Sequence, residues 1–319
     1  MILKTKRLNG KRRAAGINGI EGQTAELAIV AGHGIATDRT RLEADSGSSR
    51  RRQHLPASST EVQDTEPAVD LAAKKRSLFG MSTALWSSHG EHLVEPGWWK
   101  AMSGARSVNL NVILCHGADS ELVARNLDFV NGRIPTLIGL AGPALGHAKV
   151  LCDTGLVCIG TSAFMALQDI NDLAFEFDPQ AIEARPADLS EVQDVLCETF
   201  RYTPEMARTA IPEDVCTTPG QRVWVLWVDG RICSTVATVV VESVLAVWSM
   251  ATRPDLQRQG YGRRLLSTAL AQAASEGVTE SLLLATPAGE ALFRALGYGV
   301  MEHWQQWSRP RWVWAFARS

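Results

Sequence analysis

The distribution of aromatic residues places the strongest constraint on how this chain can fold. All ten Trp, eight Phe and three Tyr lie from Phe79 onward, so the first 78 of the 319 residues contain none. A segment without large apolar side chains cannot bury enough surface to offset the entropy of ordering it. We therefore expect residues 1–78 to form a disordered, basic and polar tail, and the folded part to begin near Phe79.

Basic clusters recur along this tail and leave its role open. Lys and Arg gather at residues 4–7, 11–13, 50–52 and 74–76, with Gly- and Ser-containing stretches between them. The acid-free opening is compatible with a targeting peptide, and Arg50–Arg52 with contact to nucleic acid. A solvated tail, or an extension upstream of a true start at Met81, explains the same composition, and we favour this interpretation.

The overall composition excludes several classes of protein. Apolar residues make up 45% and charged residues 21% of the chain, and the net charge is −2, so charge does not direct it toward nucleic acid or an anionic membrane. No apolar run approaches the roughly 18 residues of a membrane helix. The six cysteines form no CxxC pair, so they indicate buried apolar positions in a reducing compartment. We expect a cytoplasmic protein without nucleic-acid or membrane partners and without a metal.

Residues 79–180 alternate between strand-like and helix-like segments. Strand patterns at 108–114, 135–140 and 156–160 are separated by helical spacing at 120–129 and 143–152. This order predicts a small βαβαβ half-domain whose sheet is covered by helices. Within it, Cys115 and His116 are neighbours at a strand end and would point to opposite faces, so we expect a structural role rather than a nucleophile and its base.

Residues 181–319 carry a longer and clearer pattern. Two alternating runs, 222–228 and 232–241, flank Asp229-Gly230, which is a strong β-hairpin signal. A third strand at 243–252 follows. The apolar face of the next helix ends at Gly277, and a further strand, helix and closing strands complete the segment. The whole chain thus predicts an α/β fold with a mixed sheet.

The most informative segment lies between the third of these strands and the helix. Gly260 and Gly262 allow the backbone to turn so that successive N–H groups face one point at the positive end of the helix dipole. This arrangement is typical of phosphate binding. Three arginines, Arg258, Arg263 and Arg264, add cationic groups that can pair with phosphates. The glycine spacing fits neither a dinucleotide fingerprint nor a Walker loop.

At these residues the chain resembles the GNAT superfamily of acyl-CoA N-acyltransferases. The family hallmark Gln/Arg-x-x-Gly-x-Gly/Ala is matched by Gln257-Arg-Gln-Gly260-Tyr-Gly262, and Leu296-Gly297-Tyr298 is similar to the family's Leu-Gly-Phe/Tyr ending. The resemblance covers residues 182–308 and implies a GNAT acyltransferase domain at 181–319. Residues 79–180 are similar to a degenerate half of the same fold that lacks the glycine turn.

The resemblance also implies the ligand and its contacts. Acetyl-CoA or another acyl-CoA would bind with its pyrophosphate on the amides of 258–263, and its pantetheine arm would pair with the backbone of 250–252. An acceptor amine would attack the thioester directly. The residues that would hold the cofactor are Met250, Ala251, Thr252, Gln257, Arg258, Gln259, Gly260, Tyr261, Gly262 and Arg263.

Two departures from the family pattern leave the catalytic residues unassigned. Phe293 stands where members often have a Tyr that protonates the leaving thiolate, and Ala246 stands where some have a Glu as general base. Glu242 and Ser249 are possible proton relays through water, although a turn residue and a packed strand hydroxyl explain them as well. A thiol with a pKa near about 8.5 needs little help to leave at neutral pH.

These observations favour an N-acetyltransferase that acts on a small amine. Two alternatives remain: a catalytically silent acyl-CoA-binding module that senses or regulates, suggested by Phe293 and Ala246, and a protein N-acetyltransferase, which would share the fold. The tryptophans are compatible with an aromatic acceptor pocket, but packing between the halves or a contact in a homo-oligomer is the simpler interpretation.

Overall fold

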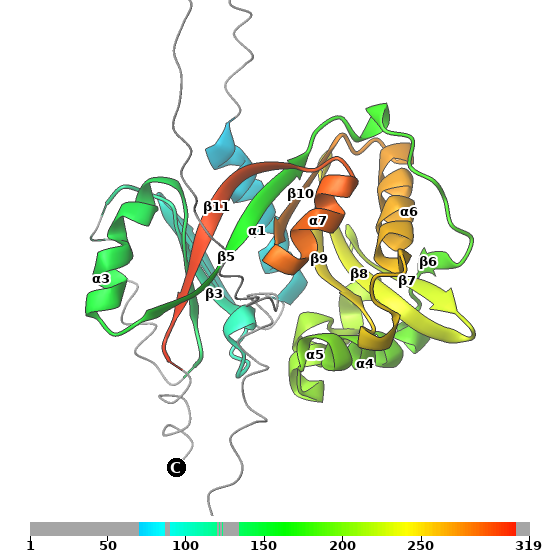
Figure 1. Cartoon of the computed structure of the whole chain (residues 1–319), viewed down its shortest axis with the longest axis horizontal. Helices are drawn as coiled ribbons and strands as arrows, with labels where there is room; N and C mark the ends of the chain where they lie inside the picture. The colour runs from blue at the N-terminus through cyan, green and yellow to red at the C-terminus, as the bar shows by residue number, and fades with distance from the viewer. Residues whose placement is uncertain (1–69, 87–89, 120, 122, 124–133, 311–319) are drawn as a thin grey trace, which may run out of the picture.

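The computed structural model describes residues 70–310 apart from 87–89, 120, 122 and 124–133 (Figure 1). Eleven strands in this part of the chain form one mixed sheet, and the predicted α/β fold is confirmed. The strands are β1 (Glu91–Glu95), β2 (Trp98–Met102), β3 (Asn111–Cys115), β4 (Leu137–Leu140), β5 (Val157–Leu167), β6 (Ala181–Glu183), β7 (Gln221–Val228), β8 (Arg231–Val241), β9 (Val244–Thr252), β10 (Glu280–Ala285) and β11 (Gly299–Ser308).

Helices cover both faces of this sheet. The α-helices are α1 (Leu71–Trp86), α3 (Ala148–Asp153), α4 (Leu189–Phe200), α5 (Pro204–Ala210), α6 (Tyr261–Ser275) and α7 (Pro287–Ala295), and the short 3-10 helices η3 (Val108–Leu110), η4 (Gly142–His147) and η8 (Pro254–Leu256) are used below. One hydrophobic core packs α1, α4 and α5 against the sheet, and a second core packs α6 and α7 against the opposite face (Figure 1). A smaller core lies under η4 and α3.

The centre of the sheet is built by an exchange of strands between the two halves of the chain. The strand order is β1-β2-β3-β4-β11-β5-β10-β9-β8-β7-β6. The last strand of the first half, β5, pairs with β10, while the last strand of the second half, β11, pairs with β4. On either side of the central antiparallel β5–β11 pair, a parallel pair follows, β3–β4 or β9–β10. The two halves therefore repeat the same order around the centre.

Side chains reinforce this exchange. Trp304 of β11 is 2% exposed and stacks on Phe164 of β5, with ring centroids 5.3 Å apart. The Gln306 amide donates to the Ser162 hydroxyl over 2.6 Å, and the Ser308 hydroxyl donates to the Thr136 carbonyl over 2.9 Å. The expected boundary near residue 180 falls in the linker between β5 and β6, residues 168–180, but the sheet does not divide there.

Local signals place the turns and helix starts of the second half. Asp229 and Gly230 both have positive φ, 50° and 78°, as a tight hairpin between β7 and β8 requires. At α5 and α7 the N-cap Thr side chain accepts the N–H of the third helical residue, and proline occupies the first position. These short-range interactions explain why the elements from 181 onward lie close to their predicted positions.

The end of the expected tail needs correction. Residues 1–69 lie outside the described part of the chain, but α1 already begins at Leu71, within the segment expected to be disordered. Leu78 is fully buried, and the Lys75 ammonium lies 2.6 Å from the Glu302 carboxylate of β11. The lack of aromatic residues before Phe79 misled the prediction because the helix extends past that point, and Phe79 and Lys75 of the helix both contact β11, at Trp304 and Glu302.

The first half differs from its prediction in detail. Strands β1 and β2 form a hairpin that the sequence did not reveal, and residues 108–110 form η3 before β3 begins. Residues 157–167 form one long strand, whereas only 156–160 were expected. Most of the helix expected at 120–129 lies outside the described residues. Cys115 is 1% exposed and burial raises the pKa of its thiol to about 12, which fits the structural role expected of it.

No helix in the described residues is long and apolar enough to cross a membrane.

The strand exchange predicts that the two halves fold only together. Fragments 70–180 and 181–319 each leave an exchanged strand without its neighbour, so each alone should remain largely unfolded, whereas an equimolar mixture should assemble. Circular dichroism and two-dimensional NMR of each fragment and of the mixture test this. A fragment 181–319 that unfolds cooperatively by itself would contradict it.

Candidate functional site

The glycine turn, residues 253–260, connects β9 to α6 through two left-handed residues. Arg258 has φ 62° and Gly260 has φ 85°. A Cβ atom added at Gly260 would meet nothing within 4 Å, so glycine is required there for its conformation and not for space. At Gly262, whose φ is helical, an added Cβ would lie 3.1 Å from Met250 Cε and 3.4 Å from Thr252 Oγ1. The second glycine thus lets α6 approach the end of β9.

The N-terminus of α6 presents N–H groups without internal acceptors. The first intrahelical bond runs from the Arg264 N–H to the Gly260 carbonyl over 3.0 Å, so the N–H groups of Tyr261, Gly262 and Arg263 precede it. No side chain caps this end. At α5 and α7, in contrast, Thr203 and Thr286 cap the helix. The open donors and the positive end of the helix dipole together favour an anion.

The three arginines expected near this anion do not behave alike. Arg258 and Arg263 are exposed, and neither makes an ion pair within the described residues. Arg264 instead donates from Nε to the Asp178 carboxylate over 2.5 Å and from Nη2 to the Gln180 side-chain oxygen over 2.8 Å. The expectation that Arg264 would pair with phosphate is therefore wrong, because its side chain lies toward the linker, which occupies it.

Strands β9 and β10 separate beside the glycine turn. They pair in parallel only from Val244 to Val247 and from Glu280 to Leu283. Beyond this point β9 pairs with β8 alone, while Leu284 and Ala285 of β10 stay paired with β5. The edge of residues 249–252 that points away from β8 therefore pairs with no strand of the described residues, as the family resemblance implied.

A bulge marks the same stretch of β9. Thr235 pairs with Ala251 and Ala237 pairs with Trp248, so Val236 alone faces both Ser249 and Met250. Ser249 has φ 48°, an unusual conformation for a residue other than glycine in a strand. Bulges near sites redirect peptide groups and side chains. The sequence offered no signal for it, because the strand pattern continues through Ser249.

The structure brings the ten predicted cofactor residues together. Met250 and Thr252 lie against the first turn of α6 at Gly262, whereas the Ala251 side chain is buried in the core on the other face of the sheet. The Gln257 side chain donates to the Thr252 carbonyl over 3.1 Å, so its amide holds the turn in place. Gln259 is exposed, and Tyr261 is half-buried against the α6–α7 core. Nothing in this arrangement assigns a ligand contact to Ala251 beyond its backbone.

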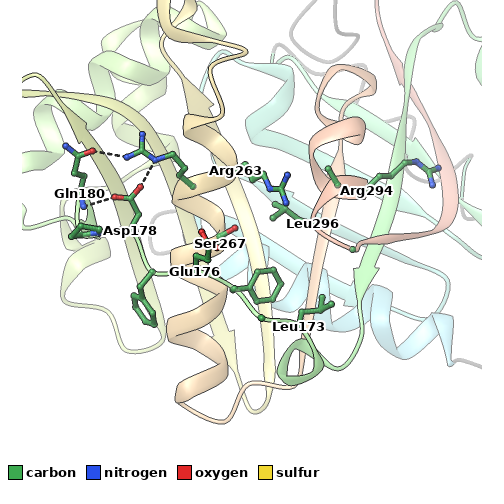
Figure 2. A pocket seen from close by; sticks show the side chains of 15 residues that line it. Leu173, Glu176, Asp178, Gln180, Arg263, Ser267, Arg294 and Leu296 are labelled. Atoms are coloured by element: carbon green, nitrogen blue, oxygen red, sulfur yellow. Dashed lines mark hydrogen bonds and ion pairs between the residues drawn. The ribbon is translucent and has the colours of Figure 1, made fainter.

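A groove of about 960 Å³ opens between α6, α7 and the linker (Figure 2). Arg263 and Ser267 line it from α6, and Arg294 and Leu296 line it from the end of α7. On the linker side, Phe177 is 59% exposed. Arg263 extends from α6 toward α7 in Figure 2. Because Arg263 is in the first turn of α6, the groove starts next to the glycine turn and continues away from it.

The linker, residues 168–180, forms one side of the groove, and Asp178 attaches it to α6. Its backbone N–H donates to the Thr268 hydroxyl over 2.9 Å, and its carboxylate accepts from Arg264. The hydrogen bond from Arg264 lowers the pKa of the Asp178 carboxyl below its ordinary value. Asp178 lies 86 positions before Arg264, so no local sequence pattern indicated this ion pair.

The positions that departed from the family pattern lie in the core. Phe293 is 7% exposed and packs edge-on against Tyr298, and Ala246 is fully buried between neighbouring strands. Glu242 is in the β8–β9 turn, before β9 starts. At about 3.3 Å per residue this turn lies more than roughly 20 Å from the end of β9, so Glu242 cannot relay a proton to the gap between β9 and β10. No cluster of metal ligands occurs among the described residues.

Comparison with known proteins adds two findings. Residues 189–298 match the sequence model of a family described as the acetyltransferase (GNAT) family. Among solved structures, a GCN5-related N-acetyltransferase from Kribbella flavida has a TM-score of 0.55 at 19% identity, over 76% of this chain and 97% of that chain. A functionally unknown conserved protein from Staphylococcus epidermidis has a TM-score of 0.50 at 11% identity, over 68% and 93%.

At these identities the structural likeness concerns the fold. Because the alignment with the Kribbella structure covers 76% of the chain, it includes residues well before the family match at 189–298. No curated protein matches the sequence of this chain.

The Asp178–Arg264 pair predicts a pH-dependent contribution to stability. Since the folded pKa of Asp178 is lowered, its contribution is fully present above the ordinary aspartate pKa near about 3.9 and is lost as the pH falls through the lower folded value. Asp178→Asn should therefore lower the free energy of unfolding by about 1 kcal/mol at pH 7 and by less near pH 2.5. Urea denaturation at both pH values measures this.

Asp153→Asn is the control for this prediction. Asp153 pairs with Lys149 on α3, but both side chains are mostly exposed, so its replacement should change little at either pH. Equal losses in the two variants would show that the linker contact is no stronger than a surface pair.

Proposed function

We propose that this chain, which carries an acetyltransferase domain of the GNAT family at residues 189–298, transfers an acetyl group from acetyl-CoA to the nitrogen of a small amine. One observation carries the proposal. The uncapped N-terminus of α6 lies beside the point where β9 and β10 separate, together with Arg258 and Arg263, which form no ion pair with the described residues. An anion site and a stretch of unpaired strand backbone are thus adjacent.

Two successive parts of acetyl-CoA, its diphosphate and its pantetheine arm, match the helix N-terminus and the β9 backbone in turn. The diphosphate of CoA would accept from the N–H groups of 258–263, where no side chain or backbone acceptor of the described residues competes. The pantetheine arm, which carries amide groups, would pair with the backbone of 250–252 along the edge of β9 that points away from β8. Its nucleotide would extend past Arg263 toward the groove, where Arg294 adds a second guanidinium and Phe177 an exposed ring.

The proposed reaction is direct transfer. The lone pair of the neutral amine attacks the thioester carbonyl carbon, a C–N bond forms, the C–S bond breaks, and the CoA thiolate takes up a proton as the amine nitrogen loses one. Holding both reactants in one gap supplies much of the rate. A backbone N–H in the bulged part of β9 would stabilise the oxygen that gains charge. A thiolate is a good enough leaving group that Phe293 does not preclude the reaction.

A second candidate is an acyl-CoA-binding module without turnover. Phe293 and Ala246, both buried, favour it because neither can move a proton. Transfer to a protein rather than to a small amine would use the same donor site. Calorimetric titration with acetyl-CoA, followed by thiol release with a panel of small amines and peptides, separates these functions. Binding with no release above background would favour the silent module, and absence of binding would reject all three.

The donor site predicts a specific effect of Gly260→Asp. The new carboxylate would lie at the N-cap position, where it can accept the free N–H groups itself and repel the diphosphate. We expect at least a hundredfold loss of acetyl-CoA affinity by calorimetry with the fold intact, because no atom lies within 4 Å of the new Cβ.

Gly277→Asp is the matched control. Gly277 also has positive φ, 89°, also has open space around it, and follows the other end of the same helix. Both variants should lose a similar amount of thermal stability through the strained backbone. If acetyl-CoA binds Gly260→Asp as tightly as Gly277→Asp, the diphosphate does not lie on this turn.

A further inference from the structure

The glycine turn is attached to the body of the protein through the side chain of its first residue. Arg253 follows β9 directly and is 8% exposed. Its Nε donates to the Ile232 carbonyl of β8 over 2.7 Å, and Nη1 forms an ion pair with Glu198 of α4. Nη2 lies 3.5 Å from the carboxylate of Glu191, which is in the first turn of α4. The guanidinium thus holds the start of the turn to two elements, β8 and α4.

Neighbouring contacts extend the same network. Glu191 also accepts the Ile232 N–H over 2.7 Å, so both backbone groups of Ile232 are held by side chains of this cluster. The Thr199 hydroxyl of α4 donates to the Thr252 carbonyl over 3.2 Å. Two consecutive residues at the end of β9 are therefore fixed by two consecutive residues of α4, Glu198 and Thr199.

The rest of the turn has few attachments of its own. Apart from Leu256 N–H to Arg253 carbonyl at 2.9 Å, no backbone hydrogen bond donated by residues 254–263 is found in the described part of the chain outside regular helix and strand bonds. The Arg231–Asp255 ion pair links η8 to β8 at the surface. Its side chains are 47% and 59% exposed, so it contributes little to the stability of the turn. Besides the Gln257 side chain, which donates to the Thr252 carbonyl, Arg253 is therefore the main attachment of the turn, and the direction of the turn depends on how Arg253 holds its first residue.

We infer that Arg253 is a positioning residue for the donor's diphosphate, an inference that rests on the proposed function. It does not touch the ligand. It fixes the start of the turn against α4 and β8, so that the N–H groups of 258–263 converge on one anion. The cost of burying a guanidinium is offset by its carbonyl and carboxylate partners, and loss of that geometry releases the turn.

The test compares two acetyl donors in wild type and Arg253→Lys. Acetyl-CoA carries the diphosphate. S-acetylpantetheine lacks it and would contact only the β9 backbone and the gap between β9 and β10. Lysine keeps the charge but cannot serve three acceptors in a planar arrangement. We expect the KM for acetyl-CoA, and its calorimetric Kd, to rise about tenfold, with kcat changed less than twofold and kcat/KM for S-acetylpantetheine changed less than twofold.

Two further variants keep the test decisive. Glu198→Gln removes the negative charge of one partner at a half-exposed position, and it should raise the acetyl-CoA KM several-fold with the same donor selectivity even if Arg253→Lys folds poorly. Arg231→Lys alters the exposed ion pair on the same turn and should leave both donors unaffected.

The outcomes are distinct. Equal losses with both donors, or no loss with either, would overturn the inference while leaving the proposed function standing. A wild type that binds no acetyl-CoA would overturn the proposed function and this inference together.

Discussion

The antiparallel pairing of β5 with β11 is the interaction on which the rest of this structure depends. It runs from Gly299 opposite Ala166 to Ser308 opposite Val157, and the stacked rings of Phe164 and Trp304 lie within it. One strand belongs to each half of the chain, so the pair joins two similar units into one sheet. Hydrophobic burial and backbone hydrogen bonds act together at this position, which is why neither half has a complete core of its own.

The same pairing explains where the candidate site lies. Leu284 and Ala285 stay bonded to Phe164 and Ala163 of β5, while Thr252 and Ala251 stay bonded to β8. Where the pairing between β9 and β10 stops, β10 thus stays paired with β5 and β9 stays paired with β8. The glycine turn then delivers the open N-terminus of α6 to that end. The open helix N-terminus and the edge of β9 that pairs with no described strand lie together because sheet topology and helix capping coincide there.

The first half of the chain shows what happens when this separation is missing. Strands β3 and β4 remain paired up to Cys115 and Leu140, and the Ala141 N–H continues the ladder to the Cys115 carbonyl over 3.0 Å. Cys115 is buried, and burial keeps its thiol protonated. This half therefore supports the sheet, supplies β5 to the other half, and presents no equivalent gap in the residues that the structure describes.

The sequence by itself determined the features that depend on neighbours along the chain. The Asp229-Gly230 hairpin, the apolar face of α6 and the left-handed Gly260 follow from periodicity and backbone freedom, and the family resemblance added the ten residues that we propose hold the donor. Only the tertiary structure decided the exchange of β5 and β11, the bulge at Ser249, the capture of Arg264 by Asp178 and the burial of Arg253 against α4. Each of these depends on which distant segment lies alongside, and a strand or an arginine carries no local mark of the partner it will meet.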